Sequence, residues 1–394
     1  MDSGSIAWML IASALVLFMT PGLAFFYGGL VRSKNIVSTM MYSFISIGLM
    51  SVVWVLWGYT IAFGEGGNDY FGSFSNLALN GIDTPDAQVF AIFQMMFAII
   101  TPALITGAFC ERFKFKTYLI FLILWITFVY APIAHWVWAS DGWLFKRGAL
   151  DFAGGAVVHI NAGVAAIAAA ALVGRRRNPG LPSNVPFVLL GASMLWFGWF
   201  GFNAGSGLAA NGQAVNAFLV TNTCAATAMM IWVLFGYIHG GKFSGVGAAT
   251  GAIAGLATIT PASGFVDVGA ALIIGIVTGI ITFYAVYFKH KVNLDDALDV
   301  FAVHGLGGMV GLIGTGIFAA EAIGGTKGLI EGSSTLLIEN IILIVATFAY
   351  SLIATLIILK ILDIIPGLGL RSTESEEDEG LDISDHGERA FVEE

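Results

Sequence analysis

The sequence predicts an all-α polytopic membrane protein with 11 transmembrane helices, an external N-terminus and a cytoplasmic C-terminus. Of its 394 residues, 57% are hydrophobic and only 11% are charged, whereas soluble proteins average about 45–50% apolar and about 25% charged residues. The mean hydropathy of +0.86 agrees with a chain that lies mostly in lipid. The net charge of −9 gives no basic surplus for nucleic acid, and two cysteines are too few for a disulfide scaffold.

Eleven apolar stretches predict the helices, because a membrane-spanning helix needs about 20 mostly apolar residues. The first stretch lacks a basic leading region and is too long for a cleavable signal peptide, so we expect it to span. The eighth is rich in glycine and threonine, and the count becomes ten if it does not cross. The stretches are 6–31, 36–63, 87–110, 117–138, 150–174, 185–207, 214–238, 246–264, 266–288, 298–320 and 335–362.

The basic residues predict the orientation, because cytoplasmic loops of membrane proteins are enriched in lysine and arginine. With the N-terminus outside, only Lys146, Arg147 and Lys327 fall on the external side. The other fourteen fall on the cytoplasmic side: Arg32, Lys34, Arg112, Lys114, Lys116, Arg175, Arg176, Arg177, Lys242, Lys289, Lys291, Lys360, Arg371 and Arg389. An odd number of spans follows.

The chain divides into a membrane domain, 1–365, and an acidic cytoplasmic tail, 366–394. The tail holds ten acidic residues against two arginines, so it carries nearly all of the net charge. An acidic tail of this kind is typical of a solvated segment. It is either a mobile solubilising segment or a segment that binds a partner.

A short internal similarity predicts two inverted five-helix repeats plus one extra helix. The sequence ALDF at 149–152 opens the fifth span, and ALDV at 297–300 opens the tenth. The halves would cover approximately 6–174 and 185–320, with the eleventh helix at 335–362 unpaired. Inverted repeats are common in transporters, which bind substrate near the membrane midplane between the halves.

Two histidines lie inside the spans, where ionisable side chains usually have a function. His159 follows Asp151 by eight residues, about 12 Å of helix, and His304 follows Asp299 by five, about 7.5 Å. Because the two spans enter from opposite sides, both imidazoles approach the membrane centre and could share a hydrogen. The alternative is two separate histidines, each bonded to a backbone carbonyl.

Acidic residues mark the starts of the same two spans. Asp151 could cap a helix N-terminus, attract a cation at the outer side, or do both. Capping and the helix dipole account for the acidic residues at the inner start of the tenth span, Asp295, Asp296 and Asp299.

Aromatic residues gather at the outer ends of two spans. Trp136, Trp138 and Trp143 crowd the end of the fourth span, where they could form an interfacial belt or bind a desolvated cation. The sixth span carries an aromatic stripe that ends at Ser206 on the same side. No motif for ATP-driven chemistry is found, and we expect neither an enzyme nor a cofactor or metal site.

Several stretches together resemble the ammonium transporter family (Amt/Mep/Rh), in particular its bacterial and archaeal Amt branch. They are FFYGG at 25–29, ALDFAGGAVVH at 149–159, FNAGS at 202–206, DVFAVHG at 299–305 and, in the tail, GLD at 380–382 with HGE at 386–388. One departure is the run Ala139–Gly142, which is one residue longer than the glycine-rich run typical of the family.

The resemblance implies a role for individual residues. Trp138 and Ser206 would form the outer recruitment site, which Asp151 would organise. The rings that close the mouth would be Phe97 and Phe202. The pore would be lined by His159, His304, Phe26 and Tyr27, and the regulatory tail would use Gly369, Arg371, Gly380 and Asp382.

The resemblance also implies an assembly and its partners. The family forms homotrimers in the cell membrane with one pore per subunit, and a PII-type signalling protein blocks the cytoplasmic face. Ammonium or ammonia would be the substrate, with methylammonium as a candidate analogue. The lipid bilayer is the remaining partner, and no nucleic acid is expected.

The physical chemistry of ammonium fits such a pore. Ammonium is close to potassium in size but has a proton to lose, and an apolar tube penalises its charged form by desolvation. The histidine pair would hydrogen-bond ammonia, relay the proton, or do both, and we expect net proton movement. Three alternatives stay open: an ammonium sensor coupled to PII signalling, a di-histidine haem membrane subunit, and passive conduction of ammonia gas.

Overall fold

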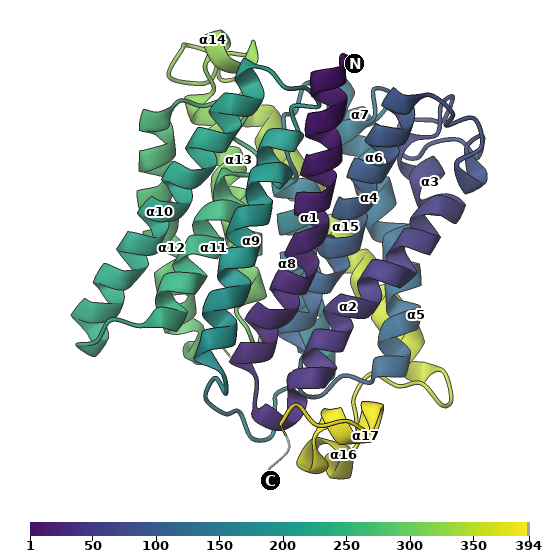
Figure 1. The fold of residues 1–394 in the computed structure, drawn as a ribbon, viewed down its shortest axis with the longest axis vertical. Helices are drawn as coiled ribbons and strands as arrows, with labels where there is room; N and C mark the ends of the chain where they lie inside the picture. The colour runs from purple at the N-terminus through teal and green to yellow at the C-terminus, as the bar shows by residue number, and fades with distance from the viewer. Residues whose placement is uncertain (293, 392–394) are drawn as a thin grey trace.

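The computed structural model describes residues 1–292 and 294–391 and is built almost entirely of helices that run roughly parallel to one long axis (Figure 1). Ten helical segments are long and apolar enough to cross a membrane. An eleventh, α11 (Gly245–Ile259), is apolar but has only 15 residues. It covers the eighth predicted span, the stretch that is rich in glycine and threonine.

The other ten predicted spans coincide with observed helices to within a few residues at most ends. The structure contains α1 (Ser3–Leu30), α2 (Ile36–Val53), α3 (Tyr59–Phe63), α4 (Pro85–Ile105), α5 (Phe115–Trp125), α6 (Ala131–Trp138), α7 (Trp143–Arg147), α8 (Asn161–Val173), α9 (Val185–Gly205), α10 (Gly212–Gly240), α12 (Val268–Phe288), α13 (Gly307–Phe318), α14 (Glu321–Gly324) and α15 (Thr335–Ile364). The tail adds α16 (Glu374–Glu379) and α17 (Leu381–His386).

Four spans contain a π-helical segment that joins or precedes an α-helix: η2 (Trp54–Gly58), η5 (Ile126–Tyr130), η6 (Gly155–Ile160) and η8 (Phe301–Leu306). The segment η6 continues into α8, and η8 continues into α13. Each of these two carries one of the span histidines. π-Helical turns are rare and concentrate at functional sites, so this local geometry already distinguishes the two spans.

Glycines let the central helices approach closely. In α9, Gly191 lies so near α1 that an added Cβ would sit 2.2 Å from the backbone nitrogen of Phe26. In α8, Gly163 faces Gly305 of η8, and an added Cβ there would meet the nitrogen of Gly305 at 2.4 Å. Small residues at such contacts are the usual means of packing helices in a membrane. The two histidine-bearing segments are therefore drawn together.

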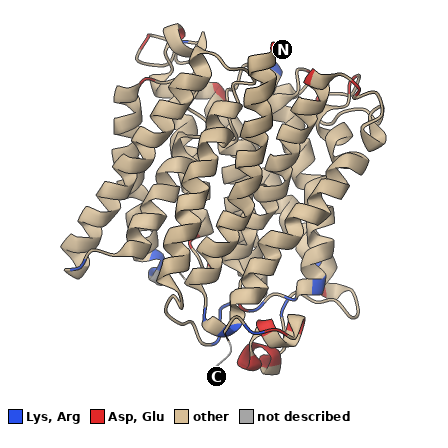
Figure 2. Cartoon of the chain, in the orientation of Figure 1, with Lys and Arg blue, Asp and Glu red and all other residues tan. Residues whose placement is uncertain are grey.

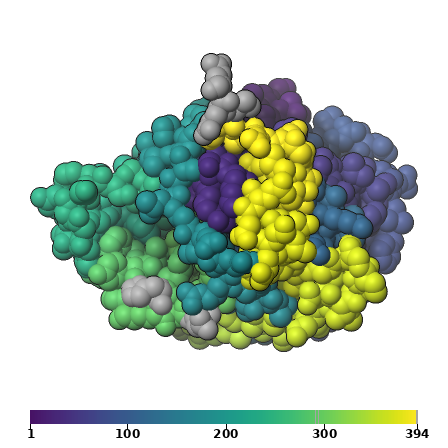
Figure 3. Space-filling model, turned by 90° about the horizontal axis from the view of Figure 1, so that it is seen from below, coloured from purple at the N-terminus to yellow at the C-terminus, as the bar shows by residue number. Residues whose placement is uncertain are grey.

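Charged residues gather at the ends of the helices, and the lower end in Figure 2 holds most of the blue ribbon together with the red tail helices. The described part of the tail does not extend freely. It lies across the lower end, beside the N-terminal helices (Figure 3). The amide of Leu381 donates to Asn35 Oδ1 at 2.9 Å, and the amide of Ser38 donates to Asp382 Oδ1 at 2.8 Å. For 366–391 these contacts favour a docked segment over a mobile solubilising one, and the last three residues lie outside the described residues.

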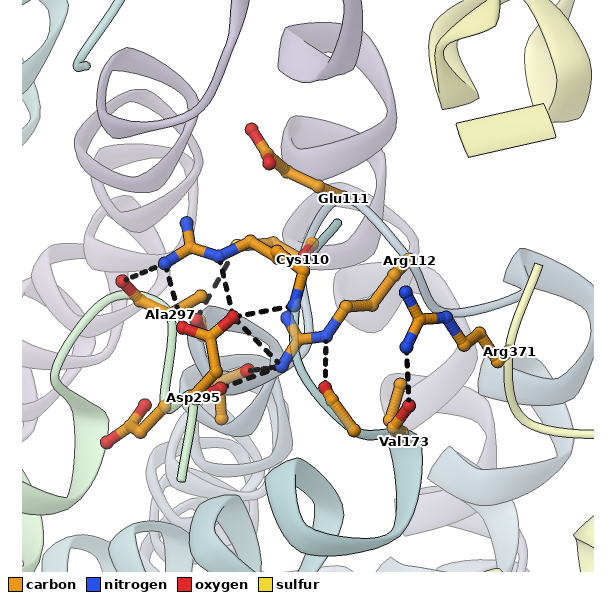
Figure 4. A network of polar contacts seen from close by, with 12 residues as sticks. Cys110, Glu111, Arg112, Val173, Asp295, Ala297 and Arg371 are labelled. Atoms are coloured by element: carbon orange, nitrogen blue, oxygen red, sulfur yellow. Dashed lines mark hydrogen bonds and ion pairs between the residues drawn. The ribbon is translucent and has the colours of Figure 1, made fainter. Parts of the chain in front are cut away.

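A buried arginine joins three segments at this end (Figure 4). Arg112 is fully buried and donates to the carbonyls of Ala108, Cys110, Gly174 and Asp295 at 2.7–3.1 Å. Beside it, Arg371 of the tail donates to the carbonyl of Val173 at 3.2 Å. The tail and the loop after α4 thus both hold the end of α8.

The three acidic residues before η8 were all expected to cap a helix or interact with its dipole, but the structure gives them different roles. Asp296 does cap, accepting from the amide of Phe301 at 2.7 Å. Asp295 instead binds Arg176 through both carboxylate oxygens at 2.9 Å, and this pairing lowers its pKa to about 2. Asp299 pairs with Lys289 at 2.5 Å. Long-range ion pairs explain two of the three residues better than the helix dipole does.

Candidate functional site

The two histidines meet in the middle of the helical bundle. Nδ1 of His159 lies 3.2 Å from Nδ1 of His304, and the ring planes are inclined by only 21°. Both side chains are buried, with 1% and 3% of their surface exposed. The prediction of a shared hydrogen is confirmed, and the alternative of two separate histidines bonded to backbone carbonyls is wrong.

An apolar cavity runs along the pair. Its walls are hydrophobic except for the two imidazoles and one indole: Met19, Leu23, Phe26, Ile100, Leu104, Val158, His159, Leu195, Trp199, Phe202, Ile253 and His304. Phe26 is one of the lining residues. Tyr27 does not line this cavity; its hydroxyl donates to the carbonyl of Leu104 at 3.0 Å.

The ring of His159 is held on two sides by neighbours. Trp199 and Phe202 stack on it at 5.5 Å and 6.0 Å between ring centroids. Nε2 of His159 lies 3.3 Å from Oγ1 of Thr260, which also accepts a hydrogen bond from Nε1 of Trp199 at 2.9 Å. Sequence reasoning missed Trp199 and Thr260. The threonine is uncharged, and its only signal was its place just before Pro261 at the end of a short helix.

Aromatic rings continue from the histidine toward the N-terminal end of α1. The rings of Phe202 and Phe97 lie 4.2 Å apart, and Phe97 meets Trp138 edge-on at 5.9 Å. Trp136 and Trp143 point elsewhere and contact each other at 6.0 Å. Of the three clustered tryptophans, Trp138 alone joins the stack that leads to His159.

Ser206 follows α9 directly and lies four residues after Phe202. Its hydroxyl donates to the carbonyl of Phe202 at 2.8 Å. A hydroxyl has one donor hydrogen and two acceptor lone pairs. Because the hydrogen is used, the lone pairs are the groups that remain for a donor such as an N–H.

Asp151 organises the start of η6. Its carboxylate accepts four backbone N–H groups, from Gly154, Gly155, Ala156 and Val157, at 2.6–3.2 Å. The predicted capping role is confirmed. Since both carboxylate oxygens are already bound and the side chain is buried, the geometry favours organisation of the site over direct contact with a cation.

The predicted tail residues form one docked surface. Gly369 accepts from the hydroxyl of Thr117 at 2.6 Å, and Arg371 binds Glu377 at 2.6 and 2.9 Å. Gly380 has a φ of +108°, and an added Cβ would lie 2.6 Å from the carbonyl oxygen of Lys34. Asp382 caps the start of α2. All four therefore contribute to holding the tail in place.

Comparisons with known proteins agree with this geometry. A family model described as the Ammonium Transporter Family matches residues 7–391. The chain is 46% identical to ammonium transporter Amt1 of Archaeoglobus fulgidus over 100% of both chains, and 46% identical to an ammonium transporter of Bacillus subtilis over 99% of both.

Solved structures show the same fold. Mep2 of Candida albicans superposes with a TM-score of 0.91 at 38% identity, covering 95% of this chain and 88% of that one. A structure described as a sensor Amt protein gives a TM-score of 0.90 at 29% identity, covering 97% and 98%.

Proposed function

The chain belongs to the ammonium transporter family, and from that premise we propose how it transports. Ammonium is recruited at an outer mouth formed by Trp138 and Ser206, which the rings of Phe97 and Phe202 close, and it gives up a proton there. Ammonia then passes along the apolar cavity beside His159 and His304, with net movement of the proton. The protein acts as a transporter and not as an enzyme.

The observation that carries this mechanism is a hydrogen-bonded imidazole pair inside an otherwise apolar cavity. A cation entering such a cavity loses its hydration and finds no carboxylate in the lining to replace it, which is costly. Ammonia is neutral and small and can exchange hydrogen bonds with an imidazole. Potassium has no proton to lose, so the same cavity excludes it.

The mouth supports recruitment of the charged form. The face of a tryptophan attracts a desolvated cation, and the acceptor lone pairs of Ser206 suit an N–H donor. Asp151 ties this mouth to the pore, because its backbone carbonyl accepts from Nε1 of Trp138 at 2.9 Å while its carboxylate caps η6. The tilted rings of Phe97 and Phe202 lie between mouth and histidines and must separate for passage.

The orientation and repeat belong to the same proposal. The distribution of basic residues supports an external N-terminus and a cytoplasmic C-terminus. The repeat is supported by the matching positions of η6 and η8, each of which carries a histidine and continues as an α-helix. We assign the protein to the cell membrane with 11 crossings, counting the short α11.

Assembly as a homotrimer is supported by unpartnered apolar surface. Within one chain only 33% of the most apolar stretch of α10 and 39% of that of α12 are buried, so both helices have faces left for neighbouring subunits or lipid. The docked acidic tail at the cytoplasmic end provides a surface for a PII-type regulator. Methylammonium is a candidate analogue substrate.

A sensing role is the second candidate, and its support is the similarity to a structure described as a sensor Amt protein. It predicts that variants without transport still report external ammonium. The haem alternative has no support from the site: the two Nδ1 atoms are 3.2 Å apart and hydrogen-bonded, which leaves no place for iron between them.

The experiment that tests the mechanism measures ammonium-induced current and luminal pH together in proteoliposomes, for wild type and His159→Ala. We expect wild type to respond to ammonium and not to potassium, and the variant to lose the response. Ammonia accumulation without any current would reject proton movement and favour passive gas conduction.

A further inference from the structure

The hydroxyl of Thr260 has three hydrogen-bond partners and one hydrogen. It lies at the end of α11, fully buried, within 2.9 Å of the carbonyl oxygen of Leu256, 2.9 Å of Nε1 of Trp199 and 3.3 Å of Nε2 of His159. A hydroxyl can donate once and accept twice. The three contacts therefore use its full capacity, and each partner's role can be worked out from its chemistry.

Two of the three roles are fixed by the partner. The carbonyl of Leu256 can only accept, so it takes the hydroxyl hydrogen. The indole Nε1 of Trp199 can only donate, so it occupies one lone pair. The lone pair that remains faces Nε2 of His159, and that nitrogen must carry a hydrogen to make the contact.

The tautomer of His159 determines the tautomer of His304. Both imidazoles are buried in an apolar cavity whose lining contains no carboxylate, so burial favours their neutral forms. A neutral His159 with its hydrogen on Nε2 has a bare Nδ1, which can only accept. Nδ1 of His304, at 3.2 Å, is consequently the donor, and Nε2 of His304 is left with its lone pair free.

We propose that Thr260 is a positioning residue that sets the tautomers of both pore histidines through its contact with Nε2 of His159. The donors form one directed chain, from His304 to His159, from His159 to Thr260, and from Thr260 to the carbonyl of Leu256. Among the described residues Nε2 of His304 has no hydrogen-bond partner, so it is the acceptor that the pair offers to ammonia. This inference rests on the proposed function of the site.

The directed chain has a consequence for proton movement. When a proton binds Nε2 of His304, Nδ1 of His304 passes its hydrogen to Nδ1 of His159, and the hydrogen on Nε2 of His159 must then leave to an ammonia molecule, which breaks the contact with Thr260. Ammonia that only hydrogen-bonds to Nε2 of His304 does not disturb that contact. Thr260 therefore slows charge transfer relative to passage of ammonia. Removing one such hydrogen bond corresponds to about a twofold to tenfold change in an equilibrium or rate.

The direct test is solid-state NMR of ¹⁵N-labelled histidine in the wild-type protein in lipid at neutral pH, assigned by comparison with His159→Ala and His304→Ala. We expect His159 to be protonated at Nε2 and bare at Nδ1, and His304 to show the opposite pattern. The reverse assignment in the wild type would overturn the proposal, and this result needs no folded Thr260 variant.

Substitutions test the role of the hydroxyl. Thr260→Val keeps the shape and removes the hydroxyl, so we expect the opposite tautomers to become populated and the charge moved per ammonia to rise about twofold to tenfold. Thr260→Ser should restore both values. The matched control is Thr258→Val on the same helix, because Thr258 is equally buried and its hydroxyl has no hydrogen-bond partner among the described residues.

The outcomes separate this inference from the proposed function. If Thr260→Val keeps the tautomers of the wild type, or if Thr258→Val changes them equally, Thr260 does not set the tautomers. The proposed transport mechanism is unaffected by that result. A wild-type protein that responds equally to ammonium and potassium would reject the proposed function. The NMR assignment would still show whether Thr260 sets the tautomers.

Discussion

Trp138 and Asp151 are joined by a hydrogen bond from the indole Nε1 to the backbone carbonyl at 2.9 Å. The carboxylate of the same aspartate caps the segment that carries His159. One residue thus contacts Trp138 through its backbone and the segment of His159 through its side chain, and a disturbance at Asp151 should reach both.

Replacing Asp151 by alanine should abolish transport. The substitution removes the acceptor of four backbone N–H groups at the start of η6. Loss of a helix cap costs about 0.5–2 kcal/mol, so the melting temperature should also fall. Asp151→Asn keeps one acceptor oxygen and should retain part of the activity. Ammonium-induced current and thermal unfolding in detergent measure the two effects. Full activity in Asp151→Ala would contradict the organising role.

Removing one ring of the mouth should weaken selection against potassium. Phe97→Ala deletes a ring that lies 4.2 Å from Phe202, and the space admits water. A hydrated mouth lowers the desolvation penalty that excludes cations. Potassium-driven current should therefore appear in this variant. Phe128→Ala, at a ring that is 56% exposed on the outside of the bundle, is the control and should leave selectivity unchanged.

Arg371→Ala should release the tail from the end of α8. The guanidinium binds Glu377 and the carbonyl of Val173. Hydrogen exchange should become faster across 372–386 and in the last turn of α8. Arg177→Ala is the matched control. Its partners Glu374 and Asp378 are 83% and 58% exposed, and surface pairs of this kind contribute little. Equal exchange in the two variants would mean that Arg371 does not hold the tail.

Asp385 should make tail docking depend on pH. Desolvation of its carboxyl in the docked tail raises its pKa to about 6, although the residue stays exposed, so the docked state favours the protonated form. Its contribution to docking is present below the pKa of the free carboxyl, about 4, and is lost as the pH rises through about 6. At pH 7.5, Asp385→Asn should slow hydrogen exchange across 381–386 relative to wild type.

Well below pH 6 the wild type and Asp385→Asn should converge. Burial lowers the pKa of the neighbouring His386, so the effect of His386 on docking has the opposite pH dependence. Because His386 is present in both proteins, the comparison removes its effect. A constant difference between the proteins at all pH values would show that Asp385 does not titrate on docking.

Much of the site could be predicted from the sequence, because ionisable and aromatic residues in apolar spans are rare enough to stand out. His159, His304 and Asp151 were found in this way, and the resemblance supplied Phe97 and Phe202. Thr260 was missed because a single threonine in a membrane helix carries no distinctive pattern. Its importance depends on which side chains α9 and η6 bring to it.

The fold, like the site, could be predicted only in part from the sequence. Hydropathy predicted the spans, since it responds to length and composition, and it also marked α11 as uncertain. It could not reveal the π-helical turns, because an extra residue in a helical turn changes the hydrogen bonding and leaves the apolar character unaltered. The pairing of Asp295 with Arg176 joins residues 119 positions apart, and docking of the tail depends on such distant contacts.

The stack of Phe97 and Phe202 also bears on cellular energetics. The centroids of the two rings lie 4.2 Å apart, and Phe202 stacks on the ring of His159. A continuous file of water would conduct protons and drain the gradient that powers the cell. We expect the closed rings to interrupt such a file, so that a membrane can hold many copies of the protein without losing protons between transport events.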